Sequence, residues 1–248
     1  MNSPFSLAGK NILVTGASSG IGRALAIECS LQGAAVTISG RNSDRLAETL
    51  ELLFKGPDHQ CFIADLDVDE EVYALADSLS RLDGLILNAG LIKSMPAKFT
   101  KREHIDQIFN VNFYSTALLV QRLLKGRKLN TGASICLISS VASQYVSVGN
   151  TIYSASKGAV NSYTKALALE LSSKQIRVNA ILPGFVNTNL LSDSHVTAEE
   201  LAVHEGKYPI GRFGTPQDVA YLGVYLLSDA SSWMTGSLLT LDGGFSLR

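Results

Sequence analysis

The sequence has few cysteines, almost no net charge and no long apolar run, and each of these shortages excludes a class of protein. The three cysteines, Cys29, Cys61 and Cys136, are far apart and lie in apolar segments. This placement predicts reduced core residues rather than a disulfide framework or a metal site. The formal net charge of −1 over 248 residues gives no basic bias toward nucleic acid or an anionic membrane surface.

Signals for export, membrane insertion and metal binding are missing as well. The longest apolar runs, such as "AYLGVYLL", are far shorter than the roughly 18 residues of a membrane helix. The first residues lack the basic and apolar segments of a secretory signal. The histidines show no metal-ligand spacing, so we expect no metal, and loop or surface positions for His59, His104, His195 and His204. The expectation that follows is a cytoplasmic protein.

Short apolar segments alternate with helical patterns along the chain. The segments that we expect to be buried strands are 11–16, 35–40, 60–66, 84–90, 133–140, 177–184 and 236–244. Strands that alternate with helices form right-handed crossovers and a parallel sheet covered on both faces. We therefore predict a single α/β domain over residues 1–248, a Rossmann-type doubly wound parallel sheet of about seven strands with helices on both faces. Residues 187–209 interrupt the alternation and are predicted to form a substrate lid.

The first strand ends in the glycine-rich turn "TGASSGIG", which continues directly into a helix. Gly16, Gly20 and Gly22 permit a sharp turn, close approach of a pyrophosphate to the backbone, and close packing of helix on strand. The helix N-terminus adds unpaired N–H groups and the positive end of the helix dipole. The spacing differs from the general G-x-G-x-x-G fingerprint, but the position after the first strand favours a nucleotide site over a structural turn.

The end of the second strand indicates which nucleotide. A carboxylate there normally binds the free 2′-hydroxyl of the adenosine ribose, whereas this chain has Gly40 followed by Arg41. A guanidinium binds a 2′-phosphate, which a carboxylate would repel. NADP(H) is therefore favoured and NAD(H) is the alternative. The alternative explanation is structural: Arg41 would be an ordinary solvated loop arginine, grouped with the basic residues Arg45 and Lys10.

A series of short motifs resembles the short-chain dehydrogenase/reductase family nearly from end to end. The motifs are "TGASSGIG", "DL" at Asp65, "NAG" at Asn88, "VN" at Val111, "ISS" at Ile138, "YSASK" at Tyr153, "PGFVNT" at Pro183 and "LDGG" at Leu241. The interval between Ser140 and Tyr153 is also the usual one in that family. The resemblance implies an oxidoreductase that interconverts a ketone and a secondary alcohol by hydride transfer.

The resemblance implies a catalytic group of Asn112, Ser140, Tyr153 and Lys157. The tyrosine and the lysine are four residues apart and share one face of a predicted helix, a pattern that a solvated face would show equally well. In the family the tyrosine is the general acid or base, and the lysine ammonium lowers its pKa from about 10. Lys157 is further expected to hold the nicotinamide ribose, Ser140 to hydrogen-bond the substrate oxygen, and Asn112 to anchor a water that links Lys157 to solvent.

Cofactor contacts carry over in the same way. Asp65 is expected to bind the adenine amino group and Asn88 with Gly90 to line the adenine ribose, with a loop N-cap and a simple turn as the structural alternatives. Ser19 replaces the arginine or lysine of many NADP(H)-dependent members, which weakens the NADP(H) prediction. The implied cofactor-binding residues are Gly16, Ser18, Ser19, Gly20, Ile21, Gly22, Arg41, Asp65, Leu66, Asn88, Ala89, Gly90, Tyr153, Lys157, Pro183, Gly184, Val186 and Thr188.

The nearest likeness within the family is to 3-oxoacyl-carrier-protein reductases. Lys125, Arg127, Lys128 and Lys174 are predicted to form a basic patch for an acidic carrier protein, with a solvated helix end as the alternative. An NAD(H)-dependent dehydrogenase of a small alcohol, sugar or steroid stays open. A non-enzymatic cofactor sensor is a remote alternative, because the catalytic residues are present. The resemblance also implies a homotetramer, a small carbonyl or alcohol substrate, and neither nucleic acid nor membrane as a partner.

Overall fold

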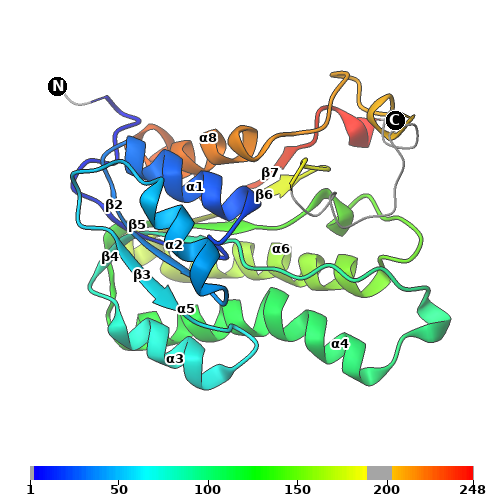
Figure 1. The fold of residues 1–248 in the computed structure, drawn as a ribbon, viewed down its shortest axis with the longest axis horizontal. Coiled ribbons are helices and arrows are strands. Elements are labelled where there is room, and N and C mark those ends of the chain that lie inside the picture. Colours follow the sequence, from blue (N-terminus) through cyan, green and yellow to red (C-terminus); the bar gives the residue numbers. More distant parts are fainter. Residues whose placement is uncertain (1–2, 189–202, 248) are drawn as a thin grey trace.

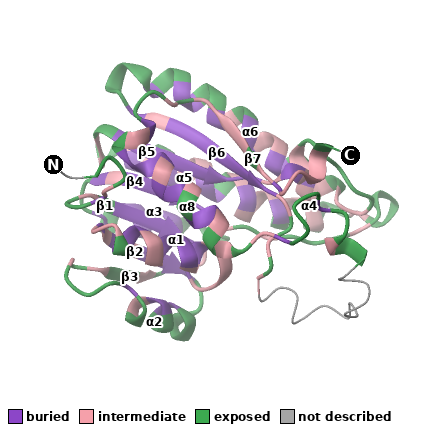
Figure 2. Ribbon diagram, turned by 90° about the horizontal axis from the view of Figure 1, so that it is seen from above, coloured by how far each residue is buried: buried purple, intermediate pink, exposed green. Residues whose placement is uncertain are grey.

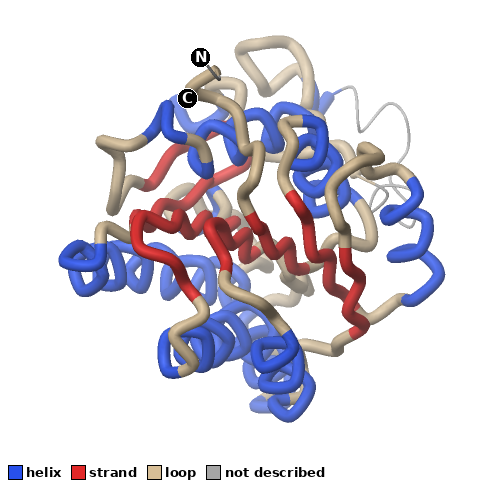
Figure 3. Tube along the Cα trace, turned by 90° about the vertical axis from the view of Figure 1, so that its left-hand side faces the viewer, coloured by secondary structure: helices blue, strands red, loops and turns tan. Residues whose placement is uncertain are grey.

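Seven strands form one parallel sheet in the order β3-β2-β1-β4-β5-β6-β7. The computed structural model describes residues 3–188 and 203–247, and Figure 3 shows the strands between two layers of helices. The predicted doubly wound sheet and its strand number are confirmed. The strands are β1 (Asn11–Thr15), β2 (Ala35–Gly40), β3 (Gln60–Ile63), β4 (Leu82–Leu87), β5 (Leu129–Ile138), β6 (Arg177–Pro183) and β7 (Leu238–Leu241).

Helices cover both faces of the sheet (Figure 1). One layer contains α1 (Gly20–Leu31), α2 (Ser43–Glu51) and α8 (Pro216–Leu227). The other contains α3 (Asp69–Ser78), α4 (Arg102–Phe109), α5 (Ser115–Lys125) and α6 (Thr151–Leu171). Each layer buries its own hydrophobic cluster against the sheet.

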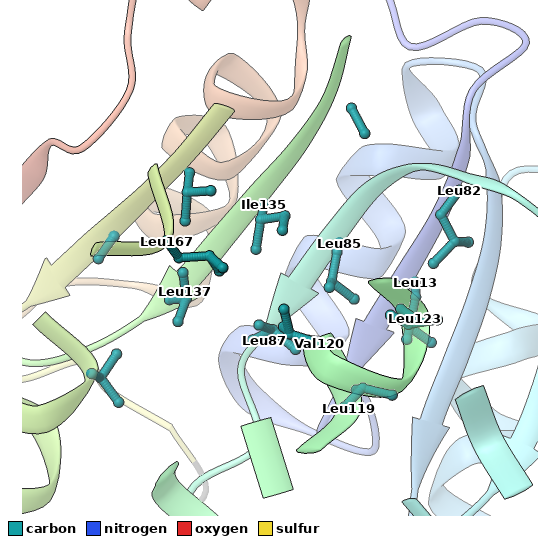
Figure 4. Close-up of a cluster of buried hydrophobic side chains, with 14 of the residues drawn as sticks. Leu13, Leu82, Leu85, Leu87, Leu119, Val120, Leu123, Ile135, Leu137 and Leu167 are labelled. Atoms are coloured by element: carbon teal, nitrogen blue, oxygen red, sulfur yellow. The ribbon is translucent and has the colours of Figure 1, made fainter. Parts of the chain in front are cut away.

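The central strands are mostly apolar because successive side chains enter different clusters. Leu13 packs with α3, α5 and α6, whereas its neighbours Ile12 and Val14 pack with α1 and α8. Figure 4 shows Leu85 and Leu87 of β4 close to Val120 of α5. Figure 2 shows the result, a sheet whose central strands are mostly buried, while exposed residues lie mainly on the outer sides of the helices and in the loops.

The long amphipathic stretch before β5 is not a single helix. It divides into α4, a π-helical turn over Asn110–Tyr114, and α5. A π turn adds one residue to a helical turn and often marks a functional site. Here it contains Asn112, whose side chain is buried. The hydrophobic periodicity of the sequence did not reveal this turn.

Several expectations need correction. Cys29 and Cys136 are buried, but Cys61 is exposed because β3 is an edge strand. Lys10 precedes β1 and forms a 2.7 Å ion pair with Asp229, so it is at the opposite end of the strands from Arg41, which follows β2.

Of the predicted lid, residues 189–202 lie outside the described residues. Within 3–188 and 203–247, no helix has the length and apolarity needed to cross a membrane.

The close packing of α1 against the glycine turn predicts a large cost for Gly22→Ala. A Cβ at Gly22 would lie 2.1 Å from the carbonyl oxygen of Gly16, a backbone atom that cannot move aside. We expect this variant to lose about 1–3 kcal/mol or more of unfolding free energy, measured by urea unfolding. Gly158→Ala is the matched control, since its Cβ meets nothing within 4 Å, and a helical alanine should be neutral or stabilising. Equal stability of Gly22→Ala and wild type would contradict the packing.

Candidate active site

The predicted site residues lie at the carboxyl edge of the sheet. Gly16 follows β1, Asn88 follows β4, and Ser140 closely follows β5. The strand order reverses between β1 and β4, because β2 and β3 lie on one side of this pair and β5 to β7 on the other. In open parallel sheets, ligands bind outside the carboxyl ends of the strands at such a reversal.

Asn88 holds the glycine turn in place. Its Nδ2 donates to the carbonyls of Thr15 and Gly16, both at 3.2 Å. The hydroxyl of Thr15 accepts from the N–H groups of Asn88 and Ala89 at 3.1 and 3.3 Å. The Asn88 side chain therefore has the turn role that the sequence left as an alternative, and the part played by Thr15 was missed.

The N-terminus of α1 can receive an anion. Ser19 occupies the N-cap position, but no side chain caps the helix and its first turn has no acidic residue. By contrast, the side chains of Asn42 and Thr215 cap α2 and α8. The first N–H groups of α1, from Gly20 onward, are thus left for a phosphate, whose charge the helix dipole favours.

The loop after β2 lies against the glycine turn. A Cβ at Gly40 would be 3.7 Å from Oγ of Ser18, so Ser18 is beside the position that a ribose-binding carboxylate would occupy. Arg41 is exposed and has no ion pair within the described part of the chain. Its guanidinium is free to bind an anion at this edge.

Arg23 braces the same turn and was not anticipated. Its Nη2 donates to the carbonyl of Ser18 at 2.8 Å and pairs with Glu48, while Nε donates to Thr49 at 2.9 Å. These bonds tie the turn to α2. The "GR" at Gly22 and Arg23 was the available signal, because an arginine in the first helical turn lies near the preceding loop.

The remaining cofactor candidates differ in burial and in the contacts that they already make. Leu66 is buried in the hydrophobic core. The carboxylate of Asp65 accepts from the N–H of Asp67 at 3.0 Å, which supports a turn role without occupying its second oxygen. Gly90 is exposed, and a Cβ there would be 3.4 Å from both Nζ of Lys157 and Oδ1 of Asn112. Gly90 thus leaves space beside the catalytic candidates.

The segment after β6 closes over the glycine turn. Gly184 contacts Asp242 so closely that a Cβ would lie 2.9 Å from its Cα. Val186 forms a β-bridge with Gly214. The Thr188 side chain reaches to 3.1 Å from the Cβ position of Gly20. Residues 183–188 therefore border the turn from the opposite side, as the resemblance implies.

Ser140, just after β5, and Tyr153, in the first turn of α6, form a pair, because hydrogen bonding by the Ser140 side chain acts on the pKa of Tyr153 in the lowering direction. The N–H of Ala142 donates to Oγ of Ser140 at 3.1 Å. In this bond the Oγ of Ser140 is the acceptor. The hydroxyl proton of Ser140 is therefore available to a second oxygen.

Lys157 lies one helical turn after Tyr153, and its side chain is buried. Only 4% of the residue is exposed, so the solvated-face alternative is wrong. Nζ donates to the carbonyl of Ile138 at 2.8 Å. Burial lowers the pKa of Lys157 to about 8, since removal from water disfavours the charged form.

The pKa of Tyr153 differs in direction from the expectation. Burial raises it above the ordinary value, and the hydrogen bond with Ser140 acts in the lowering direction. The causes of this shift are burial and Ser140, and Lys157 is not among them. The ammonium is directed to Ile138 instead, so an i, i+4 spacing alone does not activate the phenol.

Asn112 is tied to the loop after β4. Its Nδ2 donates to the carbonyl of Leu91 at 2.9 Å and to Oγ of Ser156 at 3.0 Å, and its Oδ1 accepts from the N–H of Leu91. Both N–H groups of the amide are used by protein partners. The water that Asn112 was expected to anchor remains a prediction. Since the amide N–H groups are used, such a water would have to donate to an oxygen atom of Asn112.

The Ser140–Tyr153 pair predicts how the pKa of Tyr153 changes when Ser140 is replaced. Tyr153 should ionise above pH 10, and Ser140→Ala should raise its pKa further because the bond that lowers it is lost. Absorbance at 295 nm, with the Tyr153→Phe protein subtracted to remove the other seven tyrosines, measures this pKa. Circular dichroism confirms folding at each pH. A Ser140→Ala protein with an unchanged Tyr153 pKa would contradict the pairing.

Comparisons with known proteins agree with this geometry. A family profile described as "Enoyl-(Acyl carrier protein) reductase" matches residues 16–246. The 3-oxoacyl-[acyl-carrier-protein] reductase FabG of Thermotoga maritima is 37% identical and covers 96% of this chain and 98% of its own. Among solved structures, the RhlG/NADP active-site complex of Pseudomonas aeruginosa is 31% identical with a TM-score of 0.91, covering 99% of both chains.

A third relative has a different substrate in its description. An Agrobacterium tumefaciens protein described as a 2-deoxy-d-gluconate 3-dehydrogenase, with bound NADP, is 30% identical with a TM-score of 0.90 and covers 99% of this chain and 100% of its own. The motifs, the sheet order and these full-length matches have one reading in common: the chain belongs to the short-chain dehydrogenase/reductase family of oxidoreductases, which act on carbonyl and hydroxyl groups.

Proposed function

We propose that the chain is an NADP(H)-dependent reductase of 3-oxoacyl thioesters. The observation that carries the proposal is the Ser140–Tyr153 pair, with Lys157 buried behind it, at the sheet edge that also holds the glycine turn. The similarity to FabG of Thermotoga maritima supports the substrate class. Reduction of a β-keto thioester is the reaction to test.

The proposed roles follow from the hydrogen bonds. When bound, the dinucleotide supplies the hydride that reaches the carbonyl carbon of the substrate. Tyr153 donates its phenolic proton to the carbonyl oxygen. Ser140, whose Oγ already accepts from Ala142, donates a hydrogen bond to the same oxygen and stabilises its developing charge. Lys157 places a positive charge next to the ribose side of the site, where Gly90 leaves room.

The cofactor proposal rests on the loop after β2. Gly40 supplies no carboxylate, Arg41 has a free guanidinium, and Ser18 lies beside them. NADP is bound in both solved relatives described above. The residues present therefore suit a 2′-phosphate, while the uncapped α1 suits the pyrophosphate.

The second candidate is a sugar or small-alcohol dehydrogenase. The solved relative described as a 2-deoxy-d-gluconate 3-dehydrogenase favours it. Both candidates use the same chemistry at Tyr153, so the substrate alone separates them.

The basic residues that the structure brings together differ from the patch predicted for a carrier protein. Arg81, Arg127 and Lys174 line a cavity of about 280 Å³ with Leu124 and Ile176. Lys128 instead donates to the carbonyls of Asp77 and Leu79 at the end of α3, so it is not free for a partner. Arg81 was not predicted as a member. Lys125 is the last residue of α5 and is not among the residues that line this cavity. We define the carrier patch as Arg81, Arg127 and Lys174.

The carrier patch lies at the sheet edge opposite Ser140. Arg127 precedes β5 and Ser140 follows it, and a strand of ten residues spans roughly 30 Å. That is longer than a phosphopantetheine arm, so a carrier bound there would deliver its acyl group to another copy of the chain. The proposal therefore includes the homotetramer that the family resemblance implies.

A cofactor titration tests the NADP(H) proposal. Fluorescence titration should show tighter binding of NADPH than of NADH, because the Arg41 guanidinium pairs with the 2′-phosphate. Arg41→Asp should weaken NADPH by roughly tenfold or more while NADH changes little, consistent with a charge-assisted pair of about 1.5–3 kcal/mol. Arg45→Asp, in the first turn of α2, is the control. Wild-type preference for NADH would overturn the proposal.

A substrate comparison tests the carrier proposal. Arg127→Glu/Lys174→Glu should lower kcat/KM for a carrier-linked 3-oxoacyl substrate at least tenfold, through like-charge repulsion of an acidic partner. Turnover of the same acyl group on a small thiol should not change, and Lys165→Glu on the exposed side of α6 is the control. Equal losses on both substrates would refute docking, and turnover confined to sugars would favour the second candidate.

A further inference from the structure

A chain of polar side chains lies directly behind Ser140. The hydroxyl of Ser139 donates to Oδ1 of Asn161 at 2.7 Å. Nδ2 of Asn161 donates to Oγ of Ser143 at 2.8 Å, and the hydroxyl of Ser143 donates to the carbonyl of Ser140 at 2.6 Å. Asn161 comes from α6, one turn after Lys157, whereas the three serines belong to the segment after β5.

The direction of these bonds is fixed. Each hydroxyl has one proton, and that of Ser143 is committed to the carbonyl of Ser140. Ser143 can therefore only accept from Asn161, which places Nδ2 on that side and Oδ1 toward Ser139. Ser139 is 3% exposed and Asn161 7% exposed, so water cannot readily replace a lost partner.

The chain joins the two elements that supply the catalytic pair. The carbonyl of Ser140 accepts from the hydroxyl of Ser143 and from its backbone N–H, and the Oγ of Ser140 accepts from the N–H of Ala142. Tyr153 is two turns before Asn161 on the same helix. The amide of Asn161 is thus one of the bonds that set the relative position of Ser140 and Tyr153, together with the bonds of Ser139 and Ile138 to Lys157.

We propose that Asn161 is a positioning residue, which acts through Ser143 to hold the Ser140 hydroxyl within hydrogen-bonding distance of Tyr153 and of the substrate oxygen. The proposal rests on the roles given above to Ser140 and Tyr153. Asn161 touches neither substrate nor cofactor in this scheme. None of the sequence motifs includes it, because it lies four residues beyond "YSASK".

The test uses variants that break the chain at two places. Asn161→Leu keeps the side-chain size but has no polar atom, and Ser143→Ala removes the linking hydroxyl at a less buried position. Ser143→Thr keeps the hydroxyl and should restore wild-type behaviour. Asn179→Leu is the matched control, because Asn179 is also buried and bonds Met234 and Ser237, away from Ser140.

The first readout is ionisation of Tyr153, which does not depend on any substrate. Asn161→Leu and Ser143→Ala should raise the Tyr153 pKa toward the value in Ser140→Ala, as followed by absorbance at 295 nm, whereas Ser143→Thr and Asn179→Leu should not. The second readout is kinetic. The two disruptive variants should lose roughly 10–100-fold in kcat, as expected for a misplaced catalytic group, with the KM for the dinucleotide unchanged.

The outcomes separate this inference from the proposed function. Folded Asn161→Leu and Ser143→Ala proteins with wild-type Tyr153 ionisation would overturn the positioning role. So would equal kinetic losses in Asn179→Leu, since that pattern reports general destabilisation. If wild type reduces no 3-oxoacyl thioester but the Tyr153 pKa shifts as described, the positioning role is supported and only the proposed substrate fails.

Discussion

The hydrogen bond from the buried ammonium of Lys157 to the carbonyl of Ile138 is the constraint on which the site depends. Burial of a charge is costly, and burial lowers the pKa of Lys157 from 10.5 to about 8. Between these values the unfolded chain binds more protons at this residue than the folded chain. Its burial therefore costs stability at neutral pH, and this cost decreases as the pH rises through that range.

That bond also links the parts of the site. Ile138 is the last residue of β5, so the ammonium fixes α6 against the strand end where Ser140 begins the next turn. Asn161 strengthens the same junction one helical turn later. On the other side of the edge, Asn88 ties β4 to the glycine turn. Two amides and one lysine thus align the ends of β1, β4 and β5, and the parallel sheet brings those ends together.

The sequence predicted the elements that depend on local pattern. Apolar segments such as 11–16 and 133–140 became β1 and β5, since both faces of a covered parallel strand are buried. It could not predict contacts between distant segments: the π turn at Asn112, the use of Lys128 at the end of α3, and the exposure of Cys61 each depend on neighbours far along the chain. Motif spacing located Tyr153 and Lys157, but the direction of the tyrosine pKa depends on burial, which spacing does not show.

The measurement that tests this account most directly is the pKa of Lys157 itself. Carbon-13 NMR of the full chain labelled at lysine Cε, with Lys157 assigned by Lys157→Arg, follows this residue separately from the surface lysines. The account predicts that Lys157 titrates near pH 8, well below the ordinary lysine value of 10.5. Titration of Lys157 together with the exposed lysines would mean that its ammonium is solvated, and the junction between α6 and β5 described here would be wrong.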